Sequence, residues 1–154
     1  MKPRLLIAES DVCLADDYRH FFWKRGFDVE TADDGLQCLD MLQQCPPHAL
    51  ILDYDLAWGG GDGVLARMRE DCHLTSIPVL VITDSASVHV NGSARHALGG
   101  APVVACFRKP FRMESLWSAL SVEIPELATE QFLAEAECLL PLVREQFDTG
   151  LLVH

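Results

Sequence analysis

The feature that most constrains the fold is a series of short apolar runs separated by longer stretches with helical patterning. Two of these runs are Ala49–Asp53 and Pro78–Thr83, and only the last residue of each is polar. As strands, both would therefore present apolar side chains on both faces. A half-exposed antiparallel strand would alternate apolar and polar residues, so these runs indicate a parallel sheet covered by helices on both sides. The same β-rich composition predicts further strands at Arg4–Ala8, Val29–Ala32 and Val103–Phe107.

The stretches between these strands can each supply a crossover helix. We expect helices at Asp11–Arg25, Asp34–Gln44, Gly63–Asp71 and roughly 85–98, with Gly26 and Gly99 as helix terminators. The alternation predicts an α/β fold of the (βα)5 type, a doubly wound parallel sheet of five strands. In such sheets the reactive groups gather at the carboxyl ends of the strands.

Length and charge restrict the classes of partner. With 154 residues and 49% hydrophobic composition, the chain suits one globular domain plus an appendage. Its net charge of −11 opposes capture of a phosphate backbone, so we expect no nucleic-acid partner. The sequence has no apolar run of the roughly 18 residues that a membrane helix needs. It also begins with Met-Lys-Pro-Arg rather than a signal-peptide core, so we expect no membrane association and a cytoplasmic location.

The cysteines and histidines do not form a familiar metal-binding pattern. Six cysteines are scattered without a Cys-x-x-Cys pair, so we expect reduced, mostly packing thiols and no thiolate metal site. Six histidines show no His-x-x-x-His pair and no cluster with acids at ligand spacing. We therefore expect no imidazole metal site either.

Polar side chains follow four of the predicted strands. They are Glu9, Ser10 and Asp11 after the first strand, Asp53 and Asp55 at the third, Thr83 and Asp84 at the fourth, and Lys109 after the fifth. A lone acid before a helix is usually an N-cap, but carboxylates gathered in a low dielectric favour proton uptake or a divalent cation. Hard oxygen ligands select Mg²⁺, while a lysine and a threonine suit phosphoryl oxygens.

Taken together, these residues resemble the receiver domain of two-component response regulators over about residues 4–121. The resemblance rests on the acids after the first strand, Asp53, Thr83 and the Lys-Pro-Phe sequence at 109–111. It implies a flavodoxin-like receiver fold in which Asp53 accepts a phosphoryl group from a histidine kinase or phosphotransfer protein. Such a domain is a switch that signals to a downstream protein partner, not an enzyme.

The resemblance also implies the other roles at the site. Glu9, Asp53 and the backbone carbonyl of Asp55 would hold Mg²⁺. Thr83 would bind a phosphoryl oxygen and Lys109 would pair with the phosphate. The Lys109–Pro110 peptide would be cis, a geometry that only X-Pro bonds reach at low cost.

Two positions depart from the family pattern. Ser10 stands where a second acid usually ligates Mg²⁺. Replacing that carboxylate with a hydroxyl removes at most about 4 kcal/mol of attraction between the site and the ion for each unit of charge, at an effective dielectric near 20. We therefore expect weak Mg²⁺ binding. Asp11 either compensates or caps the first helix, and we favour the cap. Cys106 stands where the family usually has the aromatic switch residue, and Phe107 should face the other way along a strand.

These departures keep two alternatives open. Ser10 and Cys106 suit a pseudo-receiver, a protein-binding module that works without phosphorylation. The Asp53-Tyr54-Asp55 sequence also resembles the acid pair of haloacid dehalogenases, but a further acid pair is missing after Lys109.

The loop after Asp53 is rich in glycine and carries Trp58. We expect Trp58 to fold over the edge of the site as a hydrophobic lid, the alternative being part of a docking surface. Asp62 is our candidate N-cap for the helix predicted from Gly63.

The receiver pattern ends near residue 122, so we predict a receiver domain at 1–122 and an acidic amphipathic helical extension at 123–154. The extension carries seven acids against one base, Arg144, and an apolar stripe at helical spacing that includes Phe132, Ala136, Leu139, Leu140, Val143 and Phe147. Pro141 should kink or break this helix. We expect it to pack back on the receiver, the alternative being a partner-binding or homodimer-forming helix.

Overall fold

The computed structural model describes residues 2–84 and 102–124 of the chain. The chain divides into two compact units, residues 1–120 and 121–154, and nearly all the described residues belong to the first. Within the described ranges, no helix is long and apolar enough to span a membrane.

The first unit contains one parallel sheet of five strands in the order β2-β1-β3-β4-β5. The strands are β1 (Arg4–Ala8), β2 (Asp28–Ala32), β3 (Ala49–Asp53), β4 (Val79–Thr83) and β5 (Val103–Arg108). The predicted strands are thus confirmed, with ends that differ by no more than one residue. This is the flavodoxin-like arrangement that the resemblance implies.

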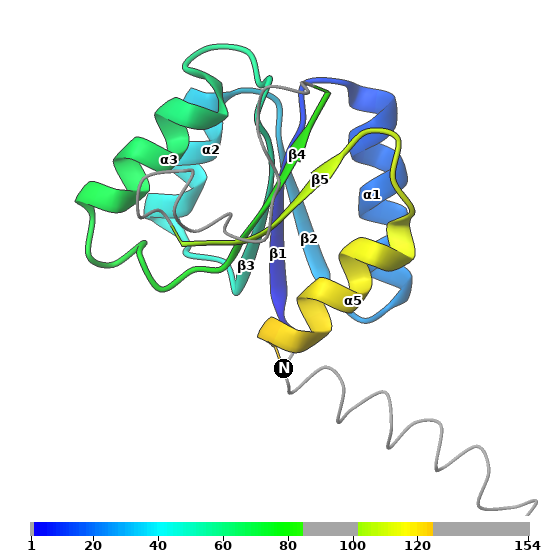
Figure 1. Cartoon of the computed structure of the whole chain (residues 1–154). Coiled ribbons are helices and arrows are strands. Elements are labelled where there is room, and N and C mark those ends of the chain that lie inside the picture. The colour runs from blue at the N-terminus through cyan, green and yellow to red at the C-terminus, as the bar shows by residue number, and fades with distance from the viewer. Residues whose placement is uncertain (1, 85–101, 125–154) are drawn as a thin grey trace, which may run out of the picture. The chain divides into compact units, whose positions relative to one another are not determined.

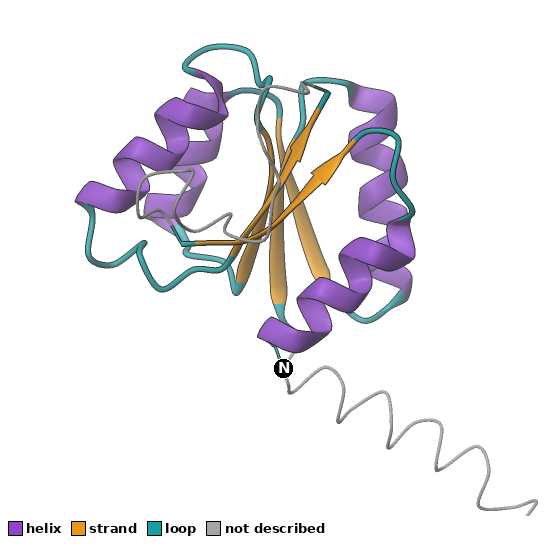
Figure 2. Ribbon diagram, viewed as in Figure 1, coloured by secondary structure: helices purple, strands orange, loops and turns teal. Residues whose placement is uncertain are grey.

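Helices cover both faces of the sheet. They are α1 (Val12–Lys24), α2 (Gly35–Gln44), α3 (Gly60–Glu70) and α5 (Met113–Glu123). Figures 1 and 2 show α1 and α5 on one face and α2 and α3 on the other. The helix expected at about 85–98, its terminator Gly99 and nearly all of the 123–154 extension lie outside the described residues.

Burial explains the composition of the strands. Every residue of β3 and β4 is buried, as expected for central strands with helices on both faces. The edge strand β2 instead exposes Asp28 and Glu30. Charged side chains on an edge strand hinder pairing with another chain.

The ends of the first two helices follow the expected capping chemistry. Asp11 Oδ1 accepts hydrogen bonds from the N–H groups of Cys13 (2.9 Å) and Leu14 (3.2 Å), and so caps α1. Asp34 Oδ1 accepts one from the Gln37 N–H at 2.7 Å and caps α2. Gly26 follows α1 with φ +93°, a left-handed conformation that confirms it as the terminator.

The predicted start of α3 is wrong by three residues. The helix begins at Gly60 rather than Gly63, and Gly59 occupies the N-cap position with φ +95° and no side-chain cap. The left-handed turn at Gly59 lets the chain enter the helix early, and the Gly61 N–H donates to the Tyr54 carbonyl at 3.0 Å. Asp62 consequently lies in the first turn and is not the N-cap.

Candidate functional site

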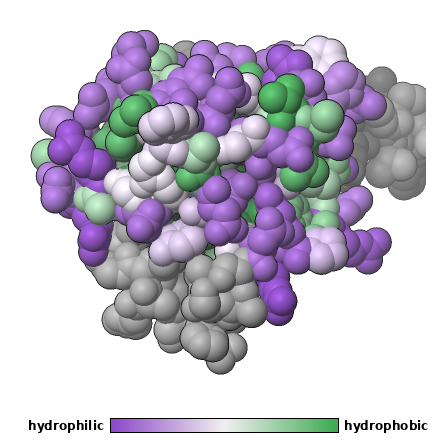
Figure 3. All heavy atoms as spheres, turned by 90° about the horizontal axis from the view of Figure 1, so that it is seen from above, coloured by the Kyte–Doolittle hydropathy of each residue, from purple (hydrophilic) through white to green (hydrophobic). Residues whose placement is uncertain are grey.

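The carboxyl ends of the strands form the upper edge of the sheet in Figure 1. Seen from above in Figure 3, this face is mostly hydrophilic. The buried polar side chains of the described ranges are Glu9, Asp53 and Thr83, which are 3%, 5% and 1% exposed. They lie at or just after the ends of β1, β3 and β4. The topology therefore brings together the side chains that the sequence predicts to meet.

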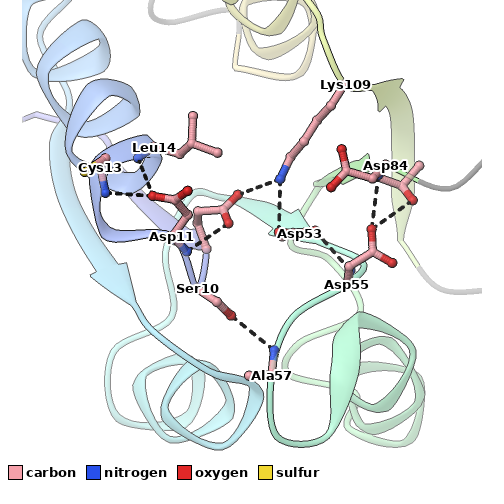
Figure 4. Close-up of polar contacts among 11 residues, drawn as sticks. Ser10, Asp11, Cys13, Leu14, Asp53, Asp55, Ala57, Asp84 and Lys109 are labelled. Atoms are coloured by element: carbon pink, nitrogen blue, oxygen red, sulfur yellow. Dashed lines mark hydrogen bonds and ion pairs between the residues drawn. The ribbon is translucent and has the colours of Figure 1, made fainter.

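Lys109 joins two of these carboxylates. Its Nζ lies 3.1 Å from Glu9 Oε2 and 3.2 Å from Asp53 Oδ2, and the lysine side chain is 15% exposed (Figure 4). The Lys109 N–H donates to the Thr83 carbonyl at 2.9 Å, which continues the pairing of β4 and β5 past the end of β5. The Lys109–Pro110 peptide is cis, as predicted.

Burial and charge act against each other in this cluster. Burial raises the pKa of the Glu9 carboxyl, and Asp53 raises it further, whereas the Asp11 N–H and the Lys109 ammonium lower it. Burial lowers the pKa of Lys109, but the carboxylates of Asp53 and Glu9 outweigh burial and hold that pKa above its ordinary value. The lysine therefore stays protonated between two buried acids.

The Asp53 carboxylate is held at both oxygens. Its Oδ1 accepts a hydrogen bond from the Asp55 N–H at 3.0 Å, and its Oδ2 pairs with Lys109. Because these contacts come from the turn after β3 and from the residue that follows β5, the carboxylate has one defined orientation at the end of β3.

Asp55 lies beside the end of β4. Its Oδ2 accepts hydrogen bonds from Thr83 Oγ1 at 3.4 Å and from the Asp84 N–H at 3.1 Å (Figure 4). The Asp55 side chain therefore links the turn after β3 to the end of β4. The Thr83 hydroxyl lies at the same edge of the sheet as Asp53, as predicted from its position at the end of a strand.

Ser10 and Asp11 have other partners at this edge. Ser10 Oγ accepts a hydrogen bond from the Ala57 N–H at 3.1 Å, which ties the loop after β1 to the glycine-rich loop after β3. The carboxylate of Asp11 caps α1, as we favoured, while its N–H donates to Glu9 Oε1 at 3.1 Å. A metal-binding role for Asp11 stays a prediction.

The lid interpretation of Trp58 is wrong. Its side chain is 72% exposed, and its backbone is left-handed, with φ +51°. The Gly35 N–H donates to the Ala57 carbonyl at 3.0 Å, and a Cβ on Gly35 would lie 2.5 Å from the Trp58 carbonyl oxygen. The loop backbone thus packs on the start of α2 and leaves the indole in solvent. Its role in docking stays a prediction.

The predicted alternation at the end of β5 is confirmed. Cys106 packs against the buried core that includes residues of α2 and α3, and burial raises the pKa of its thiol. Phe107 instead contacts Phe111, with ring centroids 6.2 Å apart, and Phe111 lies 6.0 Å from Tyr18 of α1. Cys106 and Phe107 therefore point to opposite faces of the sheet.

Tyr18 is a residue near the site that the sequence analysis missed. It is 4% exposed, and burial raises the pKa of its phenol to about 12, with smaller effects from the charges of Lys109, Glu9 and Asp53. The sequence does contain a signal for its burial, because Ala15, Tyr18 and Phe22 follow one another at helical spacing and form the buried stripe of α1.

The donor set at this edge fits Mg²⁺ in its chemistry. Glu9 and Asp53 direct carboxylate oxygens at one ammonium group, so oxygens from the ends of β1 and β3 converge. Anionic oxygens are the ligands that Mg²⁺ prefers.

Comparison with known proteins identifies the family. The family model described as response regulator receiver domain matches residues 5–121. The chain belongs to this family. A receiver domain is a signalling switch of two-component systems, and this membership sets aside the haloacid dehalogenase alternative.

Known response regulators show the same likeness. Response regulator MprA of Mycobacterium bovis is 32% identical over 118 residues, which make up 75% of this chain and 48% of the relative. The corresponding protein of Mycobacterium avium is 32% identical over 115 residues, 73% of this chain and 47% of the relative. The receiver chain thus spans about half the length of the curated relatives it matches.

Solved structures support the receiver fold. A putative response regulator from Chloroflexus aurantiacus has a TM-score of 0.69 at 25% identity, covering 83% of this chain and 99% of its own. The chemotaxis response regulator CheY4 of Vibrio cholerae has a TM-score of 0.69 at 22% identity, covering 80% and 99%. The predicted fold class is therefore confirmed.

Proposed function

We propose that this receiver accepts a phosphoryl group on Asp53 from a histidine kinase or a histidine phosphotransfer protein. The observation that carries the proposal is the Asp53 carboxylate itself, buried at the end of β3 and held at both oxygens. A carboxylate whose role was only to cap a helix would instead accept N–H groups from the first turn of that helix, as Asp11 does.

The transfer is a displacement at phosphorus. A carboxylate oxygen of Asp53 forms the new P–O bond while the P–N bond of the donor phosphohistidine breaks. The electron pair of that bond stays on the imidazole nitrogen, which takes up a proton from solvent. The product is an acyl phosphate on Asp53.

The neighbouring residues would orient and balance the transferred group. Glu9, Asp53 and the Asp55 carbonyl would hold Mg²⁺, which supplies positive charge to the phosphoryl oxygens when bound. Thr83 offers a hydroxyl, and Lys109 offers an ammonium that already lies 3.2 Å from Asp53 Oδ2. Fixed donors of this kind stabilise the charge on a phosphoryl group during transfer.

Intact-mass measurement tests the proposal directly. The full chain is incubated with acetyl phosphate and Mg²⁺, beside an Asp53→Asn variant and a matched control, Asp62→Asn, in the first turn of α3. We expect one labile phosphoryl adduct on the wild type and on Asp62→Asn, and none on Asp53→Asn. Absence of the adduct, together with no Mg²⁺ binding by titration calorimetry, would overturn the proposal and favour the pseudo-receiver.

The output would be a protein contact in the cytoplasm, where receivers meet their kinases. The net charge of −11 favours a protein partner over nucleic acid. The 123–154 extension would take part by packing on the receiver or by forming a homodimer. Removing residues 123–154 should change either the unfolding free energy or the mass measured by analytical ultracentrifugation, and no change in either would remove this role.

A further inference from the structure

A second group of ligand side chains lies at the opposite edge of the sheet. Asp71, Cys72 and His73 follow the last residue of α3, in the turn that leads into β4. The turn therefore lies where the strands begin, whereas Asp53 lies where they end. The ligand atoms of the three side chains all lie within 4.8 Å of one another. The sequence analysis expected no thiolate or imidazole metal site and missed this cluster.

We propose that Asp71, Cys72 and His73 bind a divalent transition-metal ion of the Zn²⁺ class, independently of the acidic pocket. The three side chains offer a carboxylate oxygen, a thiolate sulfur and an imidazole nitrogen. Zn²⁺ takes these three ligand types at tetrahedral sites, and three protein ligands leave one position open. A thiolate favours such ions over Mg²⁺, which prefers oxygen.

The backbone of the turn is ordered by its own hydrogen bonds before any ion binds. The His73 N–H donates to Asp71 Oδ1 at 2.9 Å, and the Leu74 N–H donates to the Asp71 carbonyl at 3.0 Å. Thr75 Oγ1 donates to the Cys72 carbonyl at 3.0 Å, and the buried Leu74 side chain anchors the turn in the core. An ordered turn reduces the entropy that ion binding would otherwise cost.

Access and local charge suit a bound cation. Cys72 and His73 are exposed, so an ion can reach their side chains directly from solvent. The site follows the carboxyl end of α3, where the helix carries partial negative charge. The last turn of α3 also carries Arg67 and Arg69, and Arg67 Nη1 lies 3.9 Å from Glu70 Oε2, which offsets part of this positive charge. A hollow of about 350 Å³ borders Asp71 and Cys72 and leaves room for a water or a further ligand.

Cobalt titration tests the site on the full chain. The protein is freed of metal by dialysis against a chelator and titrated with Co²⁺, because a thiolate bound to Co²⁺ gives a near-ultraviolet charge-transfer band that carboxylates cannot give. We expect a band that saturates at one Co²⁺ per chain and that Zn²⁺, but not Mg²⁺, removes. Cys72→Ser should abolish the band. His73→Ala should weaken Co²⁺ binding by about tenfold or more, because even residues that only hydrogen-bond to a metal ligand typically cost about tenfold in metal affinity when they are replaced.

Matched variants make the result specific. Cys45→Ser changes another exposed cysteine and His20→Ala another exposed histidine, and both should leave the band unchanged. A missing band in the wild type, or a band that persists in Cys72→Ser, would overturn the proposal. Cys72→Ser should still accept phosphate from acetyl phosphate, so the test is independent of Asp53.

Discussion

The two edges of the sheet gather reactive side chains in opposite ways. At the carboxyl edge, Glu9 and Lys109 are 100 residues apart in the chain and meet at 3.1 Å within the buried site. At the amino edge, Asp71, Cys72 and His73 are consecutive and mostly exposed. The first cluster exists only when the whole sheet is formed, while the second needs one turn.

This difference predicts that the carboxyl-edge cluster contributes to folding stability and the amino-edge cluster to ion binding. The buried carboxylates have left water, so each depends on its protein partners, and loss of one partner affects folding. The exposed side chains of Cys72 and His73 are solvated in the free protein, and their loss should affect ion binding alone. Substitutions at the two edges should therefore divide into those that change unfolding and those that do not.

The largest effect should come from Lys109→Met. Removing the ammonium leaves Glu9 and Asp53 buried without their shared cation, which should lower the unfolding free energy by about 3 kcal/mol. Arg67→Met is the control, because the Arg67–Glu70 pair is exposed and should contribute less than about 1 kcal/mol. Urea denaturation of both variants measures the difference, and equal losses would contradict it.

The next effect concerns close packing at the carboxyl edge. A Cβ on Gly61 would lie 2.6 Å from the Tyr54 Cα and 2.9 Å from the Asp53 carbonyl oxygen. Gly61→Ala should therefore destabilise the protein by about 2 kcal/mol through overpacking. Gly63→Ala, in the same helix turn with nothing within 4 Å, should stabilise it by about 0.5 kcal/mol. Thermal or urea unfolding measures both, and a destabilised Gly63→Ala would refute the packing argument.

Alkaline pH should reveal the buried phenol of Tyr18. Its pKa is raised from 10 to about 12 in the folded protein, so the folded state retains a proton that the unfolded state has lost. Stability should therefore fall between pH 10 and 12, by about 1–2 kcal/mol more in the wild type than in Tyr18→Phe. Urea unfolding across this range makes the comparison, and parallel pH profiles would rule the effect out.

A smaller change is expected from an acid at position 10. Ser10→Asp should raise Mg²⁺ affinity by about tenfold, since it returns a carboxylate near Glu9 and Asp53. Ser10→Ala removes the hydroxyl that accepts the Ala57 N–H without adding charge, and it should leave affinity unchanged. Titration calorimetry decides, and an unchanged Ser10→Asp would mean that Glu9 or Asp11 already serves as the missing acid.

The smallest effect should be that of Cys72→Ser on folding. Cys72 is exposed, so the substitution should change the unfolding free energy of the protein in metal-free buffer by less than about 0.5 kcal/mol. Cys38→Ser is the matched change at a buried cysteine and should cost about 1–3 kcal/mol, because it places a hydroxyl in the core. Chemical denaturation of the pair tests whether the amino-edge cluster is as independent of folding as we infer.

Some elements follow from local pattern and others do not. Strands β3 and β4 were predictable because residues buried on both faces must all be apolar. The start of α3 was not predictable, because it depends on a left-handed Gly59 and on the hydrogen bond from the Gly61 N–H to the Tyr54 carbonyl. The expectation that most cysteines pack inside was wrong for Cys13, Cys45 and Cys72, which are exposed, and the described cysteines are free.

The sequence by itself determined the fold class and which strand ends meet, because periodicity reports burial and parallel topology brings carboxyl ends to one edge. Only the tertiary structure decided that Lys109 lies between Glu9 and Asp53, that Ser10 binds the Ala57 N–H, and that Trp58 faces solvent. These contacts depend on the direction of side chains and on loops packed by distant segments. Such directions are set by non-local packing, which no local pattern of residues encodes.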